Sequence, residues 1–242
     1  MRDVGYGREA AITTIMRISE EWRKAFPGAH AGVLALRGVI NPPRHAGLDE
    51  RKSALESELR ARYSGFNRPA FLNVPELYSY DAYYSRFKKT YHILLQLESI
   101  VLKGKPIPAV AVLVESMFMA EMEDLLLTAG HDLDVLQLPL TLDVSRGEET
   151  YTLMRGEEQT LKAGDMYIRD GKGVISSVIY GPDRRTQIRP GTKAAVFTTY
   201  APAGIPAQAV ETHLRHIRDH VLLFAPNAAT EMLVVFGGGK AG

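Results

Sequence analysis

The stretch "LLLTAGHDLDVL", residues 125–136, places a histidine and two aspartates directly behind an apolar run. His131 is followed by Asp132, and Asp134 lies three positions after the histidine. A histidine beside a carboxylate can act as a general base, because imidazole titrates near neutral pH. The same residues can instead form a turn in which His131 bonds to Asp134 or to the backbone. A metal site is disfavoured, since all three side chains would have to share one turn.

A second histidine cluster lies near the end of the chain, in "HLRHIRDH". His213, His216 and His220 are spaced by three and four residues, so they share one helical face and are in principle able to approach a metal. Arg215 and Arg218 crowd the same segment, and no second ligand-rich motif accompanies it. We therefore interpret these residues as histidines of a surface helix, and we predict neither a metal nor a cofactor.

The glycine-rich segments do not form nucleotide-binding motifs. "GGGKAG" at the end of the sequence lacks the Ser or Thr of a phosphate loop and has no room for a following helix. "GYG" near the start has no preceding strand. No Gly-x-Ser-x-Gly segment is present either, which disfavours a serine hydrolase of the usual α/β type.

The charge balance excludes a dedicated nucleic-acid clamp. The 242 residues include 29 basic and 28 acidic side chains, for a net charge of +1. Such a chain has no broad positive field, so RNA would be bound only through local patches. Two clusters are candidate RNA-binding residues, and the alternative for each is a solvated surface: Arg86, Lys88 and Lys89, and Arg184 and Arg185.

Compartment and membrane association follow from what the sequence lacks. It has no cysteine, which excludes disulfides and thiolate metal sites and fits a reducing cytosol. The apolar stretch "AVAVLVESMFMA" is interrupted by Glu115 and Ser116, so it cannot span a bilayer. The first residues show no apolar signal region. We predict a cytoplasmic protein without a membrane partner.

The hydrophobic period changes near residue 125. The first half predicts helices, with one buried strand at 31–40, and the second half predicts short strands separated by Gly, Pro and Asp turns before a last helix. This order predicts an α+β fold of one domain with helices gathered on one side of the sheets. The predicted helices cover 8–26, 45–63, two helices within 75–103, 108–124 and 206–225. The predicted strands of the second half cover 125–131, 140–146, 149–154, 165–170, 173–180 and 193–201.

Several of these segments together resemble the tRNA-editing domain, B-three/B-four, of the phenylalanyl-tRNA synthetase β subunit. The resemblance spans 106–202, and 10–225 is similar to free-standing proteins built from that domain alone. It rests on "PIPAVAVLVESMFM", then "LLLTAGHDLDVL" where the synthetase has a Gly-Gln-Pro-x-His-Ala-Phe-Asp turn, then "LTLDVSRGEETYTL", "LKAGDMYIRDGKGVISSVIYGPDRRT" and "TKAAVFTTYAP". The upstream "YDAYYSRFKKTYHILLQL" matches a helix pair of the free-standing relatives.

The resemblance implies a β-sandwich-like core of the editing-domain type, flanked by helices, over roughly 10–225, with 226–242 as a C-terminal tail. It implies a pocket for the amino acid at the 3′ end of a mischarged tRNA. Hydrolysis of that ester requires mainly a positioned water and stabilisation of the oxyanion. No aminoacylation is expected from this chain alone.

The family's functional positions fall on particular residues here. The editing histidine corresponds to His131, and the aspartate three residues later corresponds to Asp134, with a structural role. The small pocket-lining segment corresponds to Ser176, Ser177, Tyr180 and Gly181. Two positions depart from the family: its pocket threonine is replaced by Met119, and its glutamate, which reads a tyrosyl hydroxyl, is replaced by Thr198 or Thr199.

These departures leave two classes of function open. The first is an enzyme, an aminoacyl-tRNA hydrolase acting in trans with His131 as the catalytic residue. The second is a binding module that holds a tRNA end, an amino acid or a related small molecule without chemistry. Without the carboxylate, a buried tyrosyl hydroxyl loses its acceptor, so discrimination between Tyr and Phe is expected to be relaxed.

Overall fold

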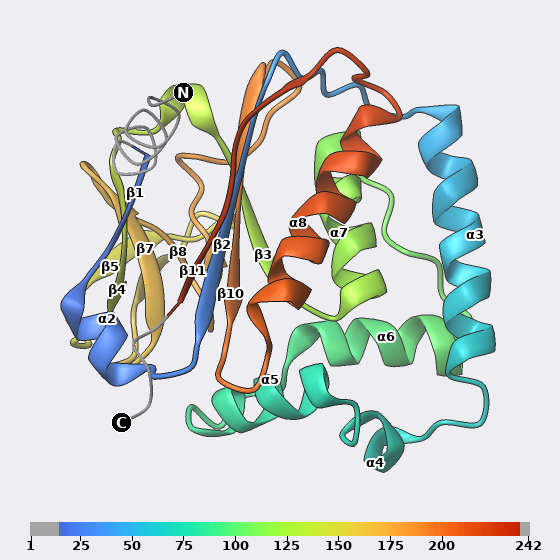
Figure 1. The fold of residues 1–242 in the computed structure, drawn as a ribbon, viewed down its shortest axis with the longest axis horizontal. Helices are drawn as coiled ribbons and strands as arrows, with labels where there is room; N and C mark the ends of the chain where they lie inside the picture. Colours follow the sequence, from blue (N-terminus) through green and yellow to red (C-terminus); the bar gives the residue numbers. More distant parts are fainter. Residues whose placement is uncertain (1–14, 238–242) are drawn as a thin grey trace, which may run out of the picture.

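The computed structural model describes residues 15–237, which form two facing β-sheets and a layer of helices (Figure 1). Residues 8–14 of the first predicted helix and most of the terminal "GGGKAG" lie outside the described part. Within residues 15–237, no helix is long and apolar enough to cross a membrane.

The helices gather on one face of the four-stranded sheet, apart from α2, which lies against the five-stranded sheet (Figure 1). This arrangement agrees with the predicted mixed α+β class. The helices are α2 (Glu20–Ala25), α3 (Ala46–Arg62), α4 (Arg68–Phe71), α5 (Pro75–Ser85), α6 (His92–Lys103), α7 (Val112–Asp124) and α8 (Ala207–Leu222), with a 3₁₀ turn η1 (Leu133–Val135).

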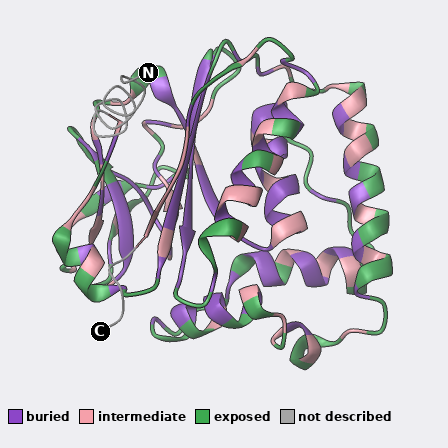
Figure 2. Ribbon diagram, viewed as in Figure 1, coloured by how far each residue is buried: buried purple, intermediate pink, exposed green. Residues whose placement is uncertain are grey.

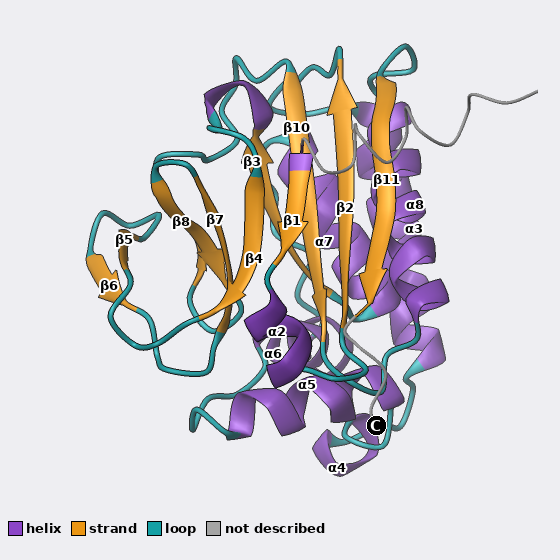
Figure 3. Cartoon of the chain, turned by 60° about the vertical axis from the view of Figure 1, so that its left-hand side comes forward, coloured by secondary structure: helices purple, strands orange, loops and turns teal. Residues whose placement is uncertain are grey.

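Two sheets face each other beneath the helical layer, and a two-stranded ribbon lies beyond them (Figure 3). The four-stranded sheet has the order β11 (Ala229–Gly237), β2 (His30–Arg37), β10 (Ala194–Ala201), β3 (Leu127–Asp132). The five-stranded sheet has the order β1 (Met16–Ile18), β4 (Leu140–Val144), β7 (Met166–Asp170), β8 (Gly173–Ser177), β9 (Gly181–Pro182). The ribbon pairs β5 (Thr150–Thr152) with β6 (Glu158–Thr160).

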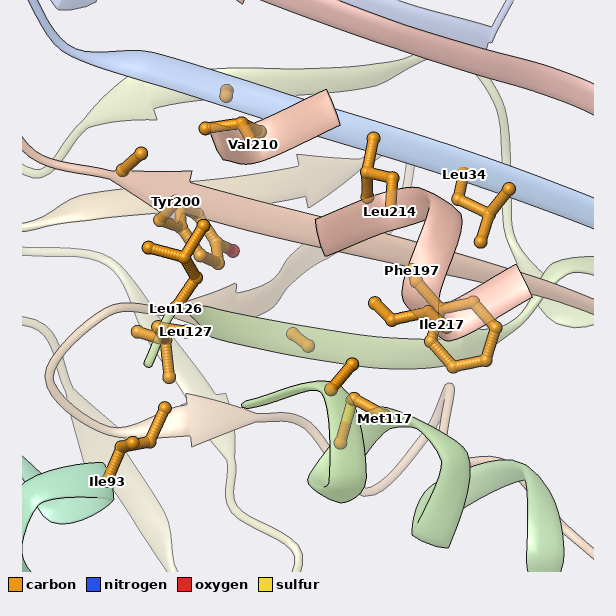
Figure 4. Close-up of a cluster of buried hydrophobic side chains, with 14 of the residues drawn as sticks. Leu34, Ile93, Met117, Leu126, Leu127, Phe197, Tyr200, Val210, Leu214 and Ile217 are labelled. Atoms are coloured by element: carbon orange, nitrogen blue, oxygen red, sulfur yellow. The ribbon is translucent and has the colours of Figure 1, made fainter. Parts of the chain in front are cut away.

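The core runs through both faces of the four-stranded sheet (Figure 2). Strand β2 is buried along nearly its whole length, which explains its uninterrupted apolar sequence. On the helical face, Leu34 of β2 and Phe197 of β10 pack beneath Leu214 and Ile217 of α8 (Figure 4). Gly32 allows this approach, since a Cβ at Gly32 would lie 2.7 Å from Val210 Cγ1 of α8.

The described part of the first predicted helix is divided, so the prediction of one helix over 8–26 is wrong there. Residues Met16–Ile18 form β1, which pairs in parallel with β4. Ser19 then starts α2, because its hydroxyl oxygen accepts from Trp22 N at 3.0 Å and its proton is donated to Asp143 Oδ1 at 2.7 Å. An N-cap in the middle of a periodic apolar pattern thus starts a new element.

The end of the chain contributes to the sheet, so the prediction of a tail over 226–242 is wrong for most of its described part. Residues Ala229–Gly237 form β11 and pair antiparallel with β2. A shift in register between Thr230 and Met232 marks an irregularity in this edge strand. The predicted helix at 108–124 begins four residues later, at Val112.

Candidate functional site

His131 lies within strand β3, where it faces Val196 of β10, and its side chain is fully buried. It belongs to the strand and not to the turn that follows. Val196, Thr198 and Tyr200 are two residues apart along β10 and therefore share one face of the sheet. Tyr200 bonds to Ser176 of β8, so this face, which includes His131, looks toward the five-stranded sheet.

The hydrogen bonds of His131 define its tautomer. Thr186 donates its hydroxyl proton to Asp183 Oδ1 and lies 2.7 Å from His131 Nδ1. His131 Nδ1 is therefore the donor, and Nε2 carries a free lone pair. Nε2 is buried and has no hydrogen-bond partner among residues 15–237. Burial, together with the nearby Arg185 guanidinium, lowers the pKa of His131 to about 3, so the imidazole is neutral at pH 7.

The two aspartates after His131 have other partners. Asp132 accepts from Thr192 Oγ1 at 2.6 Å and from Asp134 N at 3.1 Å. Asp134 forms an ion pair with Arg37 at 3.1 Å, and about half of each side chain is exposed. Asp134 therefore contributes to the surface of the turn, and Thr186 is the residue that orients the imidazole.

Ser176 and Tyr200 meet between the two sheets, where Ser176 Oγ and the Tyr200 hydroxyl form a hydrogen bond. Thr198 shares this face of β10, and its hydroxyl donates to Ala129 O at 3.4 Å. Thr199 lies on the opposite face, where its hydroxyl is 3.0 Å from Thr128 Oγ1. The structure thus separates Thr198 from Thr199.

The residues that follow Ser176 turn toward the edge of β3. Ser177 is buried, and its Oγ accepts from Tyr180 N at 3.1 Å. Gly181 has a φ of +80°, which a residue with a side chain rarely adopts, and its carbonyl accepts from Tyr151 at 2.8 Å. This tight turn brings Ser177 and Gly181 to the same cavity.

A cavity of about 250 Å³, here called the α7–β3 cavity, lies between the helical layer, the unpaired edge of β3 and the loops of the second half. Of the residues predicted for a pocket, Ser177 and Gly181 line it, whereas Met119, His131, Asp134, Ser176, Tyr180, Thr198 and Thr199 do not. The lining residues are His92 and Gln96 of α6, Val114, Met117, Phe118 and Glu121 of α7, Leu127, Thr128, Ala129 and Gly130 of β3, and Met154, Ser177, Gly181, Pro182, Gln187, Ile188 and Tyr200.

Helix α7 faces the cavity with one side. The residues that face it are three or four positions apart, as residues on one side of a helix are, and they form one stripe: Val114, Met117, Phe118 and Glu121. Met119 lies outside this stripe and is fully buried elsewhere. The neighbours of His131 in β3, Ala129 and Gly130, belong to the wall, while His131 itself does not.

Glu121 is the acidic residue of the wall. Its side chain is buried, and its Oε1 accepts from Thr128 N at 2.9 Å. Burial raises the pKa of the Glu121 carboxyl to about 8, although the Thr128 hydrogen bond opposes the rise. A cavity with an apolar wall therefore contains a carboxyl group that titrates near physiological pH.

A chain of buried polar groups connects β3 to α7 and α8. Thr128 Oγ1 lies 2.7 Å from His213 Nε2, and His213 Nδ1 lies 2.9 Å from Asp124 Oδ2. His216 Nδ1 is also 2.9 Å from Asp124, and His220 Nε2 lies 3.1 Å from Glu123 Oε2. The three histidines thus pair with acids of α7. Residues 15–237 contain no cluster of three or more His, Cys, Asp or Glu arranged to hold a metal.

The basic residues predicted to contact RNA have different environments. Arg86 lies over the rings of Phe26, Tyr83 and Phe87, at 5.5 to 5.6 Å from the ring centroids. Lys88 and Lys89 are both exposed. Arg86 is therefore held against aromatic rings of the core, whereas the two lysines make no contact of this kind with Phe26, Tyr83 or Phe87.

The second basic cluster is divided in the same way. Arg184 is exposed, whereas Arg185 holds the buried carboxylate of Asp170 through two hydrogen bonds of 2.9 and 3.0 Å. Arg185 is therefore a structural residue of the five-stranded sheet.

A shallower hollow of about 400 Å³ adjoins the α7–β3 cavity. Met154 and Pro182 belong to both walls. Lys89 and Tyr180 line the hollow, and Lys89 Nζ lies 5.9 Å from the centroid of the Tyr180 ring. Two residues predicted to have different roles, RNA binding and pocket lining, thus meet at one place.

Sequence reasoning missed Glu121, Thr128 and His92 as residues of the cavity. The only signal in the sequence was that a glutamate stands within the mostly apolar segment 108–124. Thr128 belongs to the same quoted stretch as His131, but nothing in the local pattern distinguishes its partners, which lie 71 and 85 positions later.

No protein-family model matches the sequence, and a search of the curated proteins finds no relative. Solved structures do match. One is an N-terminal fragment of the phenylalanyl-tRNA synthetase β subunit from Pyrococcus horikoshii, with a TM-score of 0.47 and 10% identity over 91% of this chain. The match covers 53% of that fragment, so this chain spans about half its length. A likeness of this size is a distant one and assigns no function.

Proposed function

We propose that the protein binds a small, mainly apolar molecule in the α7–β3 cavity. The observation that carries this proposal is the cavity itself. Its volume of about 250 Å³ exceeds the roughly 150 Å³ that accommodates a benzene molecule in an apolar protein interior. Ligand sites of proteins are typically concave and apolar with a few polar groups that fix orientation.

The wall has this composition. Met117, Phe118, Leu127 and Ile188 supply apolar surface, and Glu121 is among the few polar groups. Methionine adapts its shape to irregular ligands, because its side chain is unbranched and polarisable. An amino-acid-like molecule with a hydrophobic side chain fits a wall of this kind.

Filling the cavity tests the proposal. Ile188 lies in a loop and is partly buried, so Ile188→Trp places an indole into the cavity without disturbing a strand. A matched control is Ile40→Trp, the same change at an exposed position outside the lining. Binding of 2-phenylethanol, measured by calorimetry and by the rise in Tm, is expected for the original protein and for Ile40→Trp, and is expected to be abolished in Ile188→Trp.

Two outcomes would contradict the proposal. One is that neither 2-phenylethanol nor a charged analogue binds to the original protein. The other is that Ile188→Trp binds as tightly as the original protein.

A second candidate is the hydrolysis of aminoacyl-tRNA in trans, as the sequence resemblance implies. Two observations favour it. The hollow lined by Lys89 and Tyr180 adjoins the cavity, so an RNA end bound there would place its aminoacyl group at the cavity. His131 lies outside the lining of the cavity, but it follows the wall residues Ala129 and Gly130 in β3, and its Nε2 carries a lone pair without a partner among residues 15–237.

Deacylation of a panel of mischarged tRNAs tests this candidate. His131→Ala is expected to lower the rate by roughly ten- to a thousand-fold. Thr198→Glu is expected to favour a tyrosyl over a phenylalanyl ester if Thr198 occupies the place of the family's glutamate. A panel in which no ester is hydrolysed faster than in buffer would leave the binding module as the function.

A further inference from the structure

The carboxyl group of Glu121 differs from the other buried carboxylates of the described chain. Glu115, on the same helix, is held by Lys52 Nζ at 2.7 Å and by Val110 N at 2.8 Å. Glu98 is paired with Arg68. Glu121 has one donor, Thr128 N on Oε1, and no residue within 15–237 donates a hydrogen bond to Oε2.

Buried carboxylates without a cation exist elsewhere in the fold, but their oxygens have donors. Asp165 accepts from the Tyr83 hydroxyl at 2.6 Å on one oxygen and from Ile179 N at 3.3 Å on the other. Asp132 is likewise bonded on both oxygens. Glu121, in contrast, has an oxygen left for a molecule in the cavity.

The surroundings of Glu121 supply no positive charge. Neither Lys nor Arg lines the α7–β3 cavity within the described chain. Tyr80 and Tyr91, which lie near Glu121, have pKa values raised by burial and stay neutral. His92 is exposed, but desolvation of its imidazole nevertheless lowers the pKa to about 4, so it is uncharged at pH 7.

The charged groups on the far side of Thr128 compensate each other. Asp124 of α7 is bonded to His213 and His216 of α8, so this cluster offers no cation to Glu121. An ionised Glu121 would therefore be a buried charge without a partner, which is strongly unfavourable.

We infer that the α7–β3 cavity takes a primary ammonium ion attached to a hydrophobic group, with Glu121 as its counter-ion. This inference rests on the proposed binding function. A charge-assisted N–H···O bond to Oε2 would use the free oxygen, while the apolar part of the ligand occupies the space beside Met117 and Phe118. The proton of Glu121 passes to solvent when the ammonium binds.

The same wall disfavours a ligand that also carries a carboxylate. An anionic group in the cavity would find no Lys or Arg among the described lining residues and would lie close to Glu121. The preferred class is therefore a hydrophobic amine, or an amino acid whose carboxyl group is esterified or amidated. A free amino acid is expected to bind weakly.

Four aromatic probes test the inference by calorimetry at pH 7 on the full chain: 2-phenylethylamine, 2-phenylethanol, phenylalaninamide and phenylalanine. The amine is expected to bind at least ten-fold more tightly than the alcohol. Phenylalaninamide is expected to bind at least ten-fold more tightly than phenylalanine.

Glu121→Gln then isolates the charge. A glutamine can still accept from Thr128 N, so the fold is expected to persist. The variant should bind amine and alcohol with similar affinity while its affinity for the alcohol is unchanged. Glu123→Gln is the matched control, because Glu123 is on the same helix outside the lining and pairs with Arg51 and His220. It should keep the preference for the amine.

The outcomes separate the two proposals. If the alcohol binds the original protein as tightly as the amine, or if Glu121→Gln keeps the preference, the ammonium inference is wrong and the cavity remains a binding site. If none of the four probes binds, both proposals are wrong. The affinities of the four probes for the original protein test the ammonium inference even when a variant fails to fold.

Discussion

The hydroxyl of Thr128 lies 2.7 Å from Nε2 of His213, so one buried imidazole connects the edge strand of the four-stranded sheet to helix α8. The other ring nitrogen of His213, Nδ1, forms a hydrogen bond with Asp124 of α7. Sheet and helices are thus joined by polar bonds in addition to apolar packing, and a buried polar group that loses its partner is costly.

Thr128→Val removes this hydroxyl while preserving the shape of the side chain. It leaves His213 Nε2 and the Thr199 hydroxyl short of a partner, so the free energy of unfolding is expected to fall by about 1–3 kcal/mol. Urea denaturation measures the change. Thr150→Val, at an exposed position of β5, is the control and should change stability by less than about 0.5 kcal/mol. Equal effects of the two substitutions would contradict the role of Thr128.

The pair of His216 and Asp124 should make stability depend on pH. The hydrogen bond to Asp124 raises the pKa of His216 above its ordinary 6.5, so the stabilisation is fully present below pH 6.5 and disappears as the pH rises through the folded-state value. Burial raises the pKa of Asp124, but the bonds from His213 and His216 lower it overall, so its contribution is present above pH 3.8 and disappears in acid.

The comparison of the original protein with His216→Gln measures this effect. The substitution should destabilise the protein more at pH 5.5 than at pH 9, as judged by the urea midpoint. A difference that stays constant over this range would show that His216 does not titrate with folding.

Glu121 should make the folded state less stable as the pH rises. Burial raises its pKa from 4.5 to about 8, so its protonated form favours the folded state below pH 4.5, and this advantage disappears as the pH rises to 8. Without ligand, Glu121→Gln should therefore gain stability relative to the original protein as the pH rises from 5 to 9. Thermal unfolding across this range checks the sign, and the opposite trend with pH would contradict it.

Gly32 is required by the close approach of β2 and α8. A Cβ in Gly32→Ala would meet Val210 Cγ1 at 2.7 Å and Leu214 Cδ1 at 3.0 Å, so the helix must shift. The expected decrease in stability is about 1–3 kcal/mol. Gly191→Ala is the matched control, because a Cβ at Gly191 meets no atom within 4 Å. A Gly32→Ala variant as stable as the control would mean that α8 adapts without strain.

RNA binding, if it accompanies the cavity, should depend on the exposed lysines. Lys88→Glu combined with Lys89→Glu is expected to weaken binding of a tRNA and to flatten its salt dependence by roughly one unit for each phosphate that the protein no longer neutralises. Filter binding at several salt concentrations measures both. Arg185→Gln should instead lower stability, since the buried carboxylate of Asp170 loses its cationic partner. An unchanged salt slope in the double lysine variant would exclude this surface.

The sequence predicted elements better than it predicted contacts. The change of period at residue 125 marks the point after which most of the strands lie, because amphipathic periodicity reports which face of each element is buried. The helix predicted over 8–26 is interrupted at Ser19, whose cap is stabilised by Asp143, far away in the sequence. A local pattern carries no information about such a partner.

The site shows the same limit. The local sequence offers Asp134 as a partner for His131, but the hydrogen bond of His131 goes to Thr186, 55 positions away. Ser177 and Gly181 both line the cavity, because the tight turn at Gly181 brings them together. Glu121 acquires its role only from the cavity that forms around it, and no motif indicates such a residue.

The two sides of the α7–β3 cavity are held with different firmness. On one side, the Tyr80 hydroxyl donates to Tyr200 O and accepts from Leu127 N, which fixes α5 to the ends of two strands. On the other side, Met154 and Ile188 belong to connections between strands, and such connections open at lower free energy than packed elements. We therefore expect a molecule that binds in the α7–β3 cavity to enter and leave past Met154 and Ile188, and we expect these two side chains to set its residence time.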